Sequence, residues 1–303
     1  MAISSVQATI KGTTYNLTLN SSTGLYEASV TAPSTSSYNN NSGHYFPVTI
    51  KATDSAGNST TINDTNAILG NKMKLQVKET TAPAIVISSP TESQVTNNTK
   101  PTVNFTVTDA DSGVNPNSIS ITVDSGSAVT SGITKTAITN GYSCSYAIPT
   151  ALTDGNHIIK VNAKDNDGNA ATQRTVTFKV DATPPVLSVT TPTNNLLTNK
   201  AECTVSGKTS DVTAGIKSVT VQINGGAEKS LSIDSSGNFI TTVTLSEGAN
   251  TIVVTATDNG GLSSSVTRIV TLDTQAPVIS SVEISPNPVS TGEIFKVTVK
   301  ATD

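Results

Sequence analysis

The sequence VTIKATDSAGNSTT (48–61) recurs twice further along the chain, as IKVNAKDNDGNAAT (159–172) and IVVTATDNGGLSSS (252–265). Each copy begins with alternating apolar and polar residues, which is the pattern of a strand that buries one face. Each copy then enters an Asp-x-x-Gly turn, in which the aspartate caps local N–H groups and the glycine supplies a positive φ. The three copies therefore predict the same strand and turn in three related units.

A second motif recurs in front of each unit, as TAPAIVISSP (81–90), ATPPVLSVTTP (182–192) and TQAPVISSVEISP (274–286). Together the two motifs give a period of about 95 residues with several short strands per unit, which is typical of an immunoglobulin-like β-sandwich. We therefore predict an all-β fold of tandem immunoglobulin-like β-sandwiches, joined by short proline-stiffened linkers into a linear rod.

The composition excludes several other classes of protein. Charged residues make up 13% of the chain, which is too few for a coiled coil. The net charge is −4, the pI is near 5.2, and the 18 lysines and arginines form no basic stripe, so we expect no nucleic-acid partner. No apolar run approaches the roughly 20 residues of a membrane span. The sequence after Met1 lacks the pattern of a Sec-type signal peptide.

Alignment of the copies predicts four segments along the chain. Residues 1–78 align with strands C to G and predict an incomplete domain. Residues 79–181 and 182–273 predict two complete domains. Residues 274–303 align with strands A and B alone, so the first and last segments each lack the strands that the other has.

Half a sandwich cannot bury its inner face, and strands A and B would bury apolar side chains worth about 10 kcal/mol before the cost of ordering. Three explanations stay open: the chain is a fragment, the last segment completes the first segment of a second copy, or the two close within one chain. Exchange between copies is head to tail and builds a fibre unless it closes into a ring. The residues that we expect at such a contact are Phe295, Val297, Val299, Ala301, Ile3 and Tyr26.

Calcium is the cofactor for which the sequence offers candidate ligands, because a hard cation takes six to eight oxygen ligands. Several carboxylates of the second unit fall in loops that share one pole of the predicted sandwich. These residues are Glu79, Asp109, Asp111, Asp165 and Asp167. The third unit has only three such carboxylates, which makes it a marginal site: Asp181, Asp211 and Asp258. Alternatively, all of them are metal-free turn caps.

No pattern for catalysis accompanies these residues. The two histidines, His44 and His157, fall in different units, and the sequence contains no HExxH, P-loop or nucleophile elbow. We therefore predict that the protein is not an enzyme. Cys144 and Cys203 also fall in different units, which predicts two free buried thiols. The tyrosines and asparagines of loop 37–46 suit contact with a carbohydrate or a protein.

The repeats resemble tandem bacterial Ig-like domains, through the Ala-Thr-Asp-x-x-Gly-Asn sequence that closes strand F. The segment GLYEASVTAPSTSSYNNNSGHYFPVTIKATDSAGN (24–58) is similar to Ig-like segments of tail and virion structural proteins in phages and prophages of Firmicutes. This resemblance implies a structural component of a phage or phage-like particle, made in the cytoplasm and released by lysis. Its partners would be copies of itself or other particle subunits. The chain has no recognisable tail-tube, sheath or baseplate segment.

Two further functions stay open on the sequence. The first is a stalk or adhesin fragment at the bacterial cell surface, which would space a binding head from the cell and could meet a host-surface glycan or protein. The second is an accessory module of a secreted glycoside hydrolase.

Overall fold

The computed structural model describes residues 2–303, and β-strands make up almost all of its regular structure. The predicted all-β class is therefore confirmed. The chain has two compact units, one formed by most of residues 1–179 and the other by most of residues 180–303. Below, residues 1–78, 79–181 and 182–273 are called the first, second and third modules, and residues 274–303 the C-terminal segment. These boundaries and the linear arrangement stay predictions.

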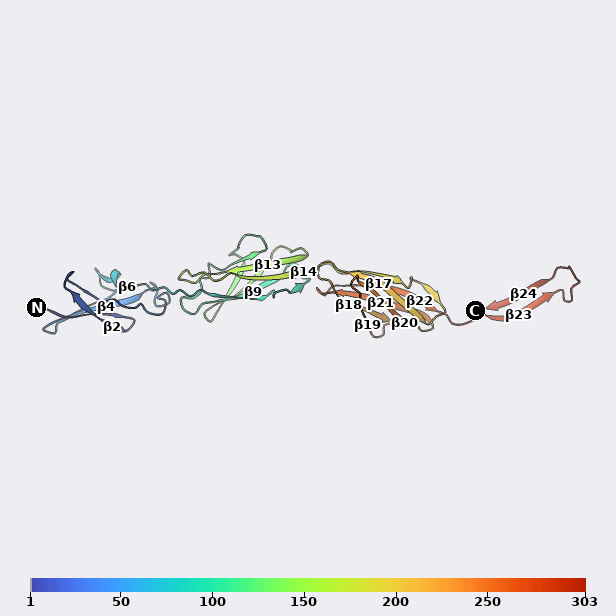
Figure 1. The fold of residues 1–303 in the computed structure, drawn as a ribbon, viewed down its shortest axis with the longest axis horizontal. Coiled ribbons are helices and arrows are strands. Elements are labelled where there is room, and N and C mark those ends of the chain that lie inside the picture. The colour runs from blue at the N-terminus through green and yellow to red at the C-terminus, as the bar shows by residue number, and fades with distance from the viewer. Residues whose placement is uncertain (1) are drawn as a thin grey trace. The chain divides into compact units, whose positions relative to one another are not determined.

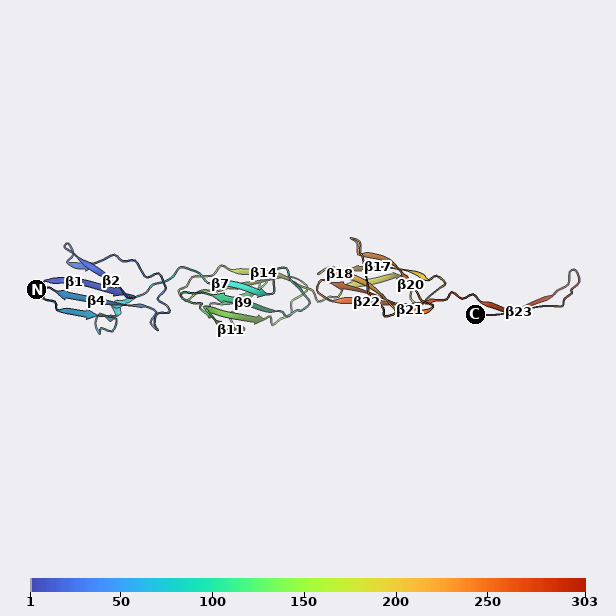
Figure 2. The ribbon, with the colours of Figure 1, turned by 90° about the horizontal axis from the view of Figure 1, so that it is seen from below.

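The first module has a single antiparallel sheet in the order β3-β2-β1-β4-β5, with a short β6 paired to β4. Figure 2 shows β1, β2 and β4 side by side. Among residues 2–78, Phe46 is the one hydrophobic side chain that is buried. A 3-10 turn at Gly70–Met73 precedes β6. The strands are β1 (Ile3–Ile10), β2 (Thr13–Asn20), β3 (Leu25–Glu27), β4 (Phe46–Asp54), β5 (Ser59–Ile62) and β6 (Lys74–Leu75).

The second module has two sheets, which bury an apolar face between them. One sheet has the order β10-β13-β14-β8, with β8 (Val95–Thr96), β10 (Ser120–Val123), β13 (Gly155–Asn162) and β14 (Arg174–Val180). The other has the order β11-β12-β9-β7, with β7 (Ala84–Ser89), β9 (Thr102–Thr108), β11 (Ile133–Ile138) and β12 (Gly141–Ala147). The alternation expected for buried strands is clear in β9, where Val103, Phe105 and Val107 are buried and Thr102 and Asn104 are exposed.

The third module repeats this arrangement, with its core between two sheets. One sheet has the order β15-β17-β20, with β15 (Val186–Thr191), β17 (Glu202–Ser210) and β20 (Asn238–Thr244). The other has the order β16-β22-β21-β18-β19, with β16 (Leu196–Thr198), β18 (Ile216–Ile223), β19 (Lys229–Leu231), β21 (Gly248–Asp258) and β22 (Ser263–Leu272). Cys203 lies in this core and Cys144 in that of the second module, and both are free thiols, as predicted. Burial raises the pKa of each thiol above its ordinary value, which keeps it protonated.

The C-terminal segment forms a two-stranded hairpin from β23 (Val278–Ser285) and β24 (Lys296–Thr302), which pair with each other in a sheet of their own (Figure 1). Every residue of both strands is exposed. Hydrophobic side chains at these positions contribute nothing to a core within the hairpin.

Candidate docking strands and acidic clusters

At two inward positions the C-terminal hairpin pairs its strands as the first two strands of the second module do, although the register shift lies at a different place in each. In the second module, Phe105 on β9 lies opposite Ile87 on β7. In the hairpin, Val297 on β24 lies opposite Ile284 on β23. The hairpin therefore reproduces the pairing of strands A and B of a sandwich.

What differs is the burial of the inner face. Phe105 is 1% exposed within the second module, whereas Val297, at the corresponding position, is 54% exposed. Its neighbours on the same face are open as well, with exposed fractions of 49% for Phe295 and 51% for Val299. Ala301 is also exposed. The hairpin thus carries the inner face of a sandwich without a sandwich to cover it.

The first module lacks the pairing that this hairpin would supply. In the third module, β20 pairs along its whole length with β17. In the first module, the corresponding strand β3 pairs with β2 and forms the edge of the sheet, and residues 28–33 have no strand partner. Of the two predicted acceptor residues, Tyr26 lies on this edge strand and Ile3 lies on β1, opposite Asp54. A contact that uses these residues stays a prediction.

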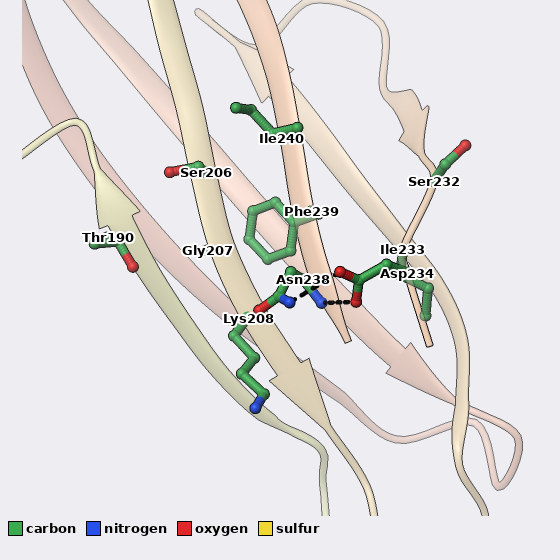
Figure 3. Close-up of a pocket in the computed structure, with 10 residues that line it drawn as sticks. All are labelled: Thr190, Ser206, Gly207, Lys208, Ser232, Ile233, Asp234, Asn238, Phe239 and Ile240. Atoms are coloured by element: carbon green, nitrogen blue, oxygen red, sulfur yellow. Dashed lines mark hydrogen bonds between the residues drawn. The ribbon is translucent and has the colours of Figure 1, made fainter. Parts of the chain in front are cut away.

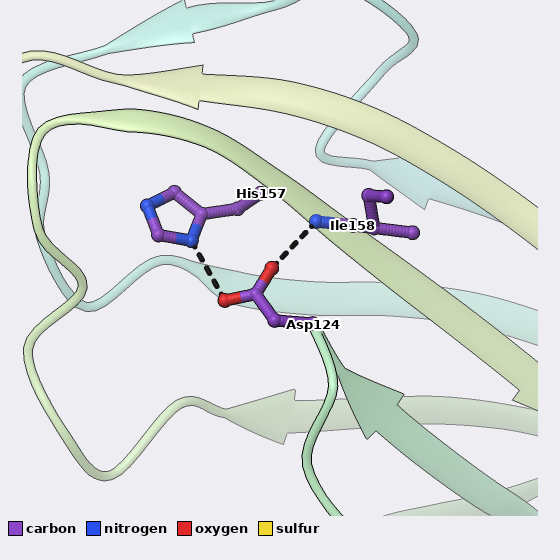
Figure 4. Close-up of polar contacts among 3 residues, drawn as sticks. All are labelled: Asp124, His157 and Ile158. Carbon is purple, nitrogen blue, oxygen red and sulfur yellow. Dashed lines mark hydrogen bonds and ion pairs between the residues drawn. The ribbon is translucent and has the colours of Figure 1, made fainter.

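His157 lies in a partly buried polar contact that ties two strands together (Figure 4). Its Nδ1 atom is 2.8 Å from Oδ2 of Asp124, and the His157 side chain is 8% exposed. The other carboxylate oxygen of Asp124 accepts the backbone N–H of Ile158 at 2.8 Å. The imidazole ring lies 5.8 Å from the ring of Phe178, at a tilt. Packing and these hydrogen bonds fix the imidazole, so the contact is a structural clamp between β10 and β13.

The aromatic side chains of loop 37–46 are held by contacts within the first module. The rings of Tyr38 and His44 stack at 4.0 Å between centroids, and Nδ1 of His44 is 2.6 Å from the carbonyl oxygen of Tyr38. The hydroxyl of Tyr45 donates to Oδ2 of Asp64 at 2.8 Å, and this bond raises the pKa of Tyr45 above its ordinary value. These groups therefore shape the loop, and contact with a glycan or protein stays a prediction.

The structure brings together three of the five predicted calcium ligands of the second module. Carboxylate oxygens of Glu79, Asp109 and Asp165 lie within 4.8 Å of one another. Donors already meet this cluster, because the backbone N–H of Ser112 donates to Oε1 of Glu79 at 2.6 Å and the side-chain amide of Asn169 donates to Oδ2 of Asp165 at 2.7 Å. Burial raises the pKa of Glu79, and the hydrogen bond from the backbone N–H of Ser112 opposes the rise.

The other two predicted ligands accept backbone N–H groups, Asp111 from the first module and Asp167 from the start of the second. Both carboxylate oxygens of Asp111 accept the N–H of Ser36 at 3.0 Å. Oδ2 of Asp167 accepts the N–H of Glu79 at 3.0 Å. The loop spacing does not reveal that backbone donors hold these two carboxylates.

The third module has an equivalent cluster, formed by Asp181, Asp211 and Asp258. One carboxylate oxygen from each lies within 4.8 Å of the others, and both Asp181 and Asp258 are 0% exposed. Burial raises the pKa of the Asp181 carboxyl, and the charges of Asp211 and Asp258 raise it further. By sequence this site is marginal because it offers fewer carboxylates, yet its geometry equals that of the cluster in the second module.

A pocket of about 820 Å³ lies beside β17 and β20 of the third module (Figure 3). Phe239 and Gly207 line it, and its two charged groups are Lys208 and Asp234. Asp234 accepts hydrogen bonds from the side-chain amide of Asn238 at 2.9 Å and from the backbone N–H of the same residue at 2.8 Å. The described lining residues include neither histidine nor cysteine.

Two family models match parts of the chain. Residues 87–182 match the model of a bacterial Ig-like domain, and residues 185–274 match the model of glucodextranase, domain B. No curated protein matches the chain. Across residues 2–303, no helix combines the length and the apolar run needed to cross a membrane.

Several solved structures are similar to the chain at low identity. Titin domains A168–A170 are 14% identical, with a TM-score of 0.42 over 88% of this chain and 86% of that one. Fibronectin(III)-like modules of Clostridium thermocellum CbhA are 16% identical, with a TM-score of 0.38 over 63% and 94%. The tetra-tandem repeat in the extending region of a large adhesion protein is 18% identical, with a TM-score of 0.32 over 98% and 79%.

These matches agree with the sheets described above. Residues 87–182 are thus similar to a bacterial Ig-like domain, and residues 185–274 are similar to domain B of glucodextranase.

Proposed function

We propose that this protein is a non-enzymatic structural component that assembles head to tail, with the β23–β24 hairpin of one copy completing the first module of the next. The observation that carries the proposal is the exposed hairpin with the A–B register of a finished sandwich. The first module supplies the complementary half, because it has one sheet and a free edge at β3. Sheet edges with unpaired N–H and C=O groups are ready templates for a strand from another chain.

Equivalent positions in the complete modules define where each donated side chain would lie. In the second module, Val107 on β9 lies opposite Tyr142 on β12. The corresponding residues would be Val299 of the donor and Tyr26 of the acceptor. By the same alignment, Val297 would lie opposite Ala28.

The gain on docking comes from apolar side chains that water now contacts. Val282, Ile284, Phe295, Val297 and Val299 are all at least 45% exposed. Burial of a large aliphatic or aromatic side chain stabilises a contact by about 1.5–3 kcal/mol, which gives about 10 kcal/mol for five partly exposed ones. Association entropy and side-chain ordering reduce this gross figure.

A second copy is the favoured partner because two modules with proline-containing joints separate the hairpin from the first module of its own chain. Exchange between copies depends on concentration, and closure within one chain does not. Light scattering and electron microscopy of the purified chain over a concentration series would separate the two, since we expect filaments or rings that dissociate on dilution.

Matched substitutions on the two faces of β24 test which face of the hairpin docks, as well as whether the protein assembles. Val297→Asp and Val299→Asp place a charge on the inner face and should leave monomers. Thr298→Asp changes the next residue, on the opposite face of β24, and should still assemble. A wild-type chain that stays monomeric at high concentration, or assembly that survives both inner-face substitutions, would refute strand donation.

We further propose that the assembly belongs to a phage or phage-like particle, such as a tail or fibre. The support is the similarity of residues 24–58 to Ig-like segments of phage structural proteins, together with the suitability of head-to-tail contacts for a fibre. The protein would then be found in the virion or an extracellular particle. Tandem Ig-like domains also suit a stalk on a bacterial surface, and a monomeric, fully folded chain would favour that function.

A further inference from the structure

We propose that Asp181, Asp211 and Asp258 of the third module bind a calcium ion. Their carboxylate oxygens lie within 4.8 Å of one another. This spacing lets a single cation contact all three. Two of the three residues are completely buried, so the cluster is not a group of solvated surface charges.

The separate observation that points to a ligand is an orphaned carboxylate oxygen. Oδ2 of Asp258 is buried and has no hydrogen-bond partner. A buried polar atom without a partner costs about 1–3 kcal/mol, and more when it carries charge. A cation at this position would supply the missing partner.

Comparison with a related turn explains why this oxygen is unpaired. Asp234 and Asp258 each begin an Asp-x-x-Gly turn, and in both the Oδ1 atom accepts a backbone N–H from four residues later. At the first turn that later residue is Asn238, whose amide also donates to Oδ2 of Asp234 at 2.9 Å. At the second it is Leu262, which has no side-chain donor. The replacement of asparagine by leucine therefore leaves the Asp258 oxygen open to a different partner.

The other oxygen atoms of the site are held in place by backbone groups. Oδ1 of Asp211 accepts the N–H groups of Ala214 and Gly215, each at 2.8 Å. Oδ2 of Asp181 accepts the N–H of Ala214 at 3.1 Å. These bonds fix two of the carboxylates before any ion arrives, which reduces the ordering cost of binding.

A peptide oxygen lies beside the carboxylates. A Cβ atom placed on Gly260 would lie 3.2 Å from Oδ1 of Asp258 and 3.3 Å from the carbonyl oxygen of Asp181, so these two oxygens flank one point. Three carboxylates, a peptide carbonyl and water are the mixture of oxygen ligands that calcium takes in irregular loops. Magnesium requires a nearly ideal octahedron with short bonds, which a site built from three separate loops suits less well.

Charge also favours a cation here. Three carboxylates gathered in a buried place repel one another, and a divalent ion offsets most of that charge. The rise in the pKa of Asp181 has burial as its largest cause and these neighbouring charges as another. In the second module, by contrast, the Asn169 amide already meets Oδ2 of Asp165. The proposal is therefore confined to the third module.

Leu262→Asn is the sharpest test, because it leaves every proposed ligand in place and supplies an amide to the orphaned oxygen. In the full chain, calcium at about a hundred times its dissociation constant should raise the melting temperature of the third module by about 10 °C relative to a chelator. Leu262→Asn should lose most of that rise, and should melt above the wild type in chelator. Asp258→Asn should also lose the calcium effect. It tests the proposal in place of Leu262→Asn if that variant does not fold.

Asn238→Leu is the matched control, since it removes the amide from the related but exposed turn at Asp234. It should keep the calcium effect. Calorimetry with calcium, and with magnesium at the same concentration, completes the experiment. The proposal is overturned if calcium does not shift the wild-type melting temperature, if the shift survives in both Leu262→Asn and Asp258→Asn, or if magnesium gives the same shift.

Discussion

The His157 imidazole and the Asp124 carboxylate meet at 2.8 Å, at the position that Asn250 and Asn224 occupy in the third module. The two pairs are equivalent in the strand register. Asp124 follows Val123, which is paired with Ile159, and Asn224 follows Ile223, which is paired with Ile252. The side-chain amide of Asn224 donates to Oδ1 of Asn250 at 3.0 Å. In both modules the residue at the end of the earlier strand, Asp124 or Asn224, also accepts the backbone N–H of the residue that follows its partner. One structural clamp is thus built from an acid and a base in one module and from two amides in the next.

The first module replaces the same clamp with a different contact. There Nζ of Lys11 lies 5.2 Å from the ring centroid of Phe46, in a cation–π arrangement. The residue after Phe46 is Pro47, which has no N–H to donate, and lysine has no acceptor to receive one. Both the donor and the acceptor of that backbone hydrogen bond are therefore missing in the first module, which suggests that the two are coupled.

Exchange of the clamp tests this coupling. Asp124→Asn or His157→Asn alone should lower the free energy of unfolding of the second module by about 1–3 kcal/mol, because the first leaves the buried imidazole poorly paired and the second removes the partner of the half-buried Asp124 carboxylate. The double variant copies the pair of the third module and should recover most of the loss. Denaturant unfolding of the four proteins measures the coupling energy, and additive losses would show that the two side chains act independently.

Equivalent positions on β9 and β24 should respond differently to the same change. Phe105→Ala removes a buried ring and should destabilise the second module by about 3–5 kcal/mol. Val297→Ala should leave the melting temperature of the dilute monomer unchanged, since the side chain packs against no core there. It should weaken head-to-tail assembly instead. Scanning calorimetry at low concentration and sedimentation at high concentration report the two effects, and a large loss of monomer stability in Val297→Ala would contradict the assignment.

A disulfide can trap the proposed register between copies. A protein with both Ala28→Cys and Val297→Cys should form cross-linked oligomers on mild oxidation, because directly paired strand positions meet the distance that a disulfide needs. The pair Ala28→Cys with Thr298→Cys is the control, since it places the second thiol on the other face of β24. Non-reducing gels distinguish the outcomes. Equal cross-linking by both pairs would indicate random collision of exposed thiols.

The turn at Asp234 should contribute to acid sensitivity. Hydrogen bonds from Asn238, first from its side-chain amide, hold the pKa of the Asp234 carboxyl below its ordinary value of 3.8. A folded-state pKa below the unfolded value gives stability that is present above about pH 4 and is lost as the pH falls through the folded pKa. Asn238→Ala should therefore reduce the loss of third-module stability between about pH 5 and about pH 2. Thermal melts across this range measure it, and Asn58→Ala, at a similar turn of the first module, is a matched control that should leave the third module unchanged.

Much of this fold can be predicted from the sequence, because strand alternation and Asp-x-x-Gly turns are local signals. The alternation in residues 252–256 predicts which side chains of β21 enter the core, and Ile252, Val254 and Ala256 are indeed buried. The clamp at His157 was not predicted, since it depends on which residues of β10 and β13 are paired across the sheet.

The acidic clusters show a similar division. Loop spacing predicts that Glu79, Asp109 and Asp165 share one pole of the sandwich, but which carboxylates already have backbone donors depends on loop conformation. Aligned copies show that Leu262 stands where Asn169 follows the equivalent turn, and this difference alone suggests an aspartate oxygen without its usual amide.

A ribbon of only two strands has few neighbouring groups to protect it from solvent. The amide hydrogens of β24 should therefore exchange with deuterium much faster than those of β9, although the two strands carry the same kind of register. Docking into a finished sandwich would slow that exchange by orders of magnitude. The C-terminal segment is thus a natural reporter, since its exchange rate would record the occupied fraction of subunits without any attached label.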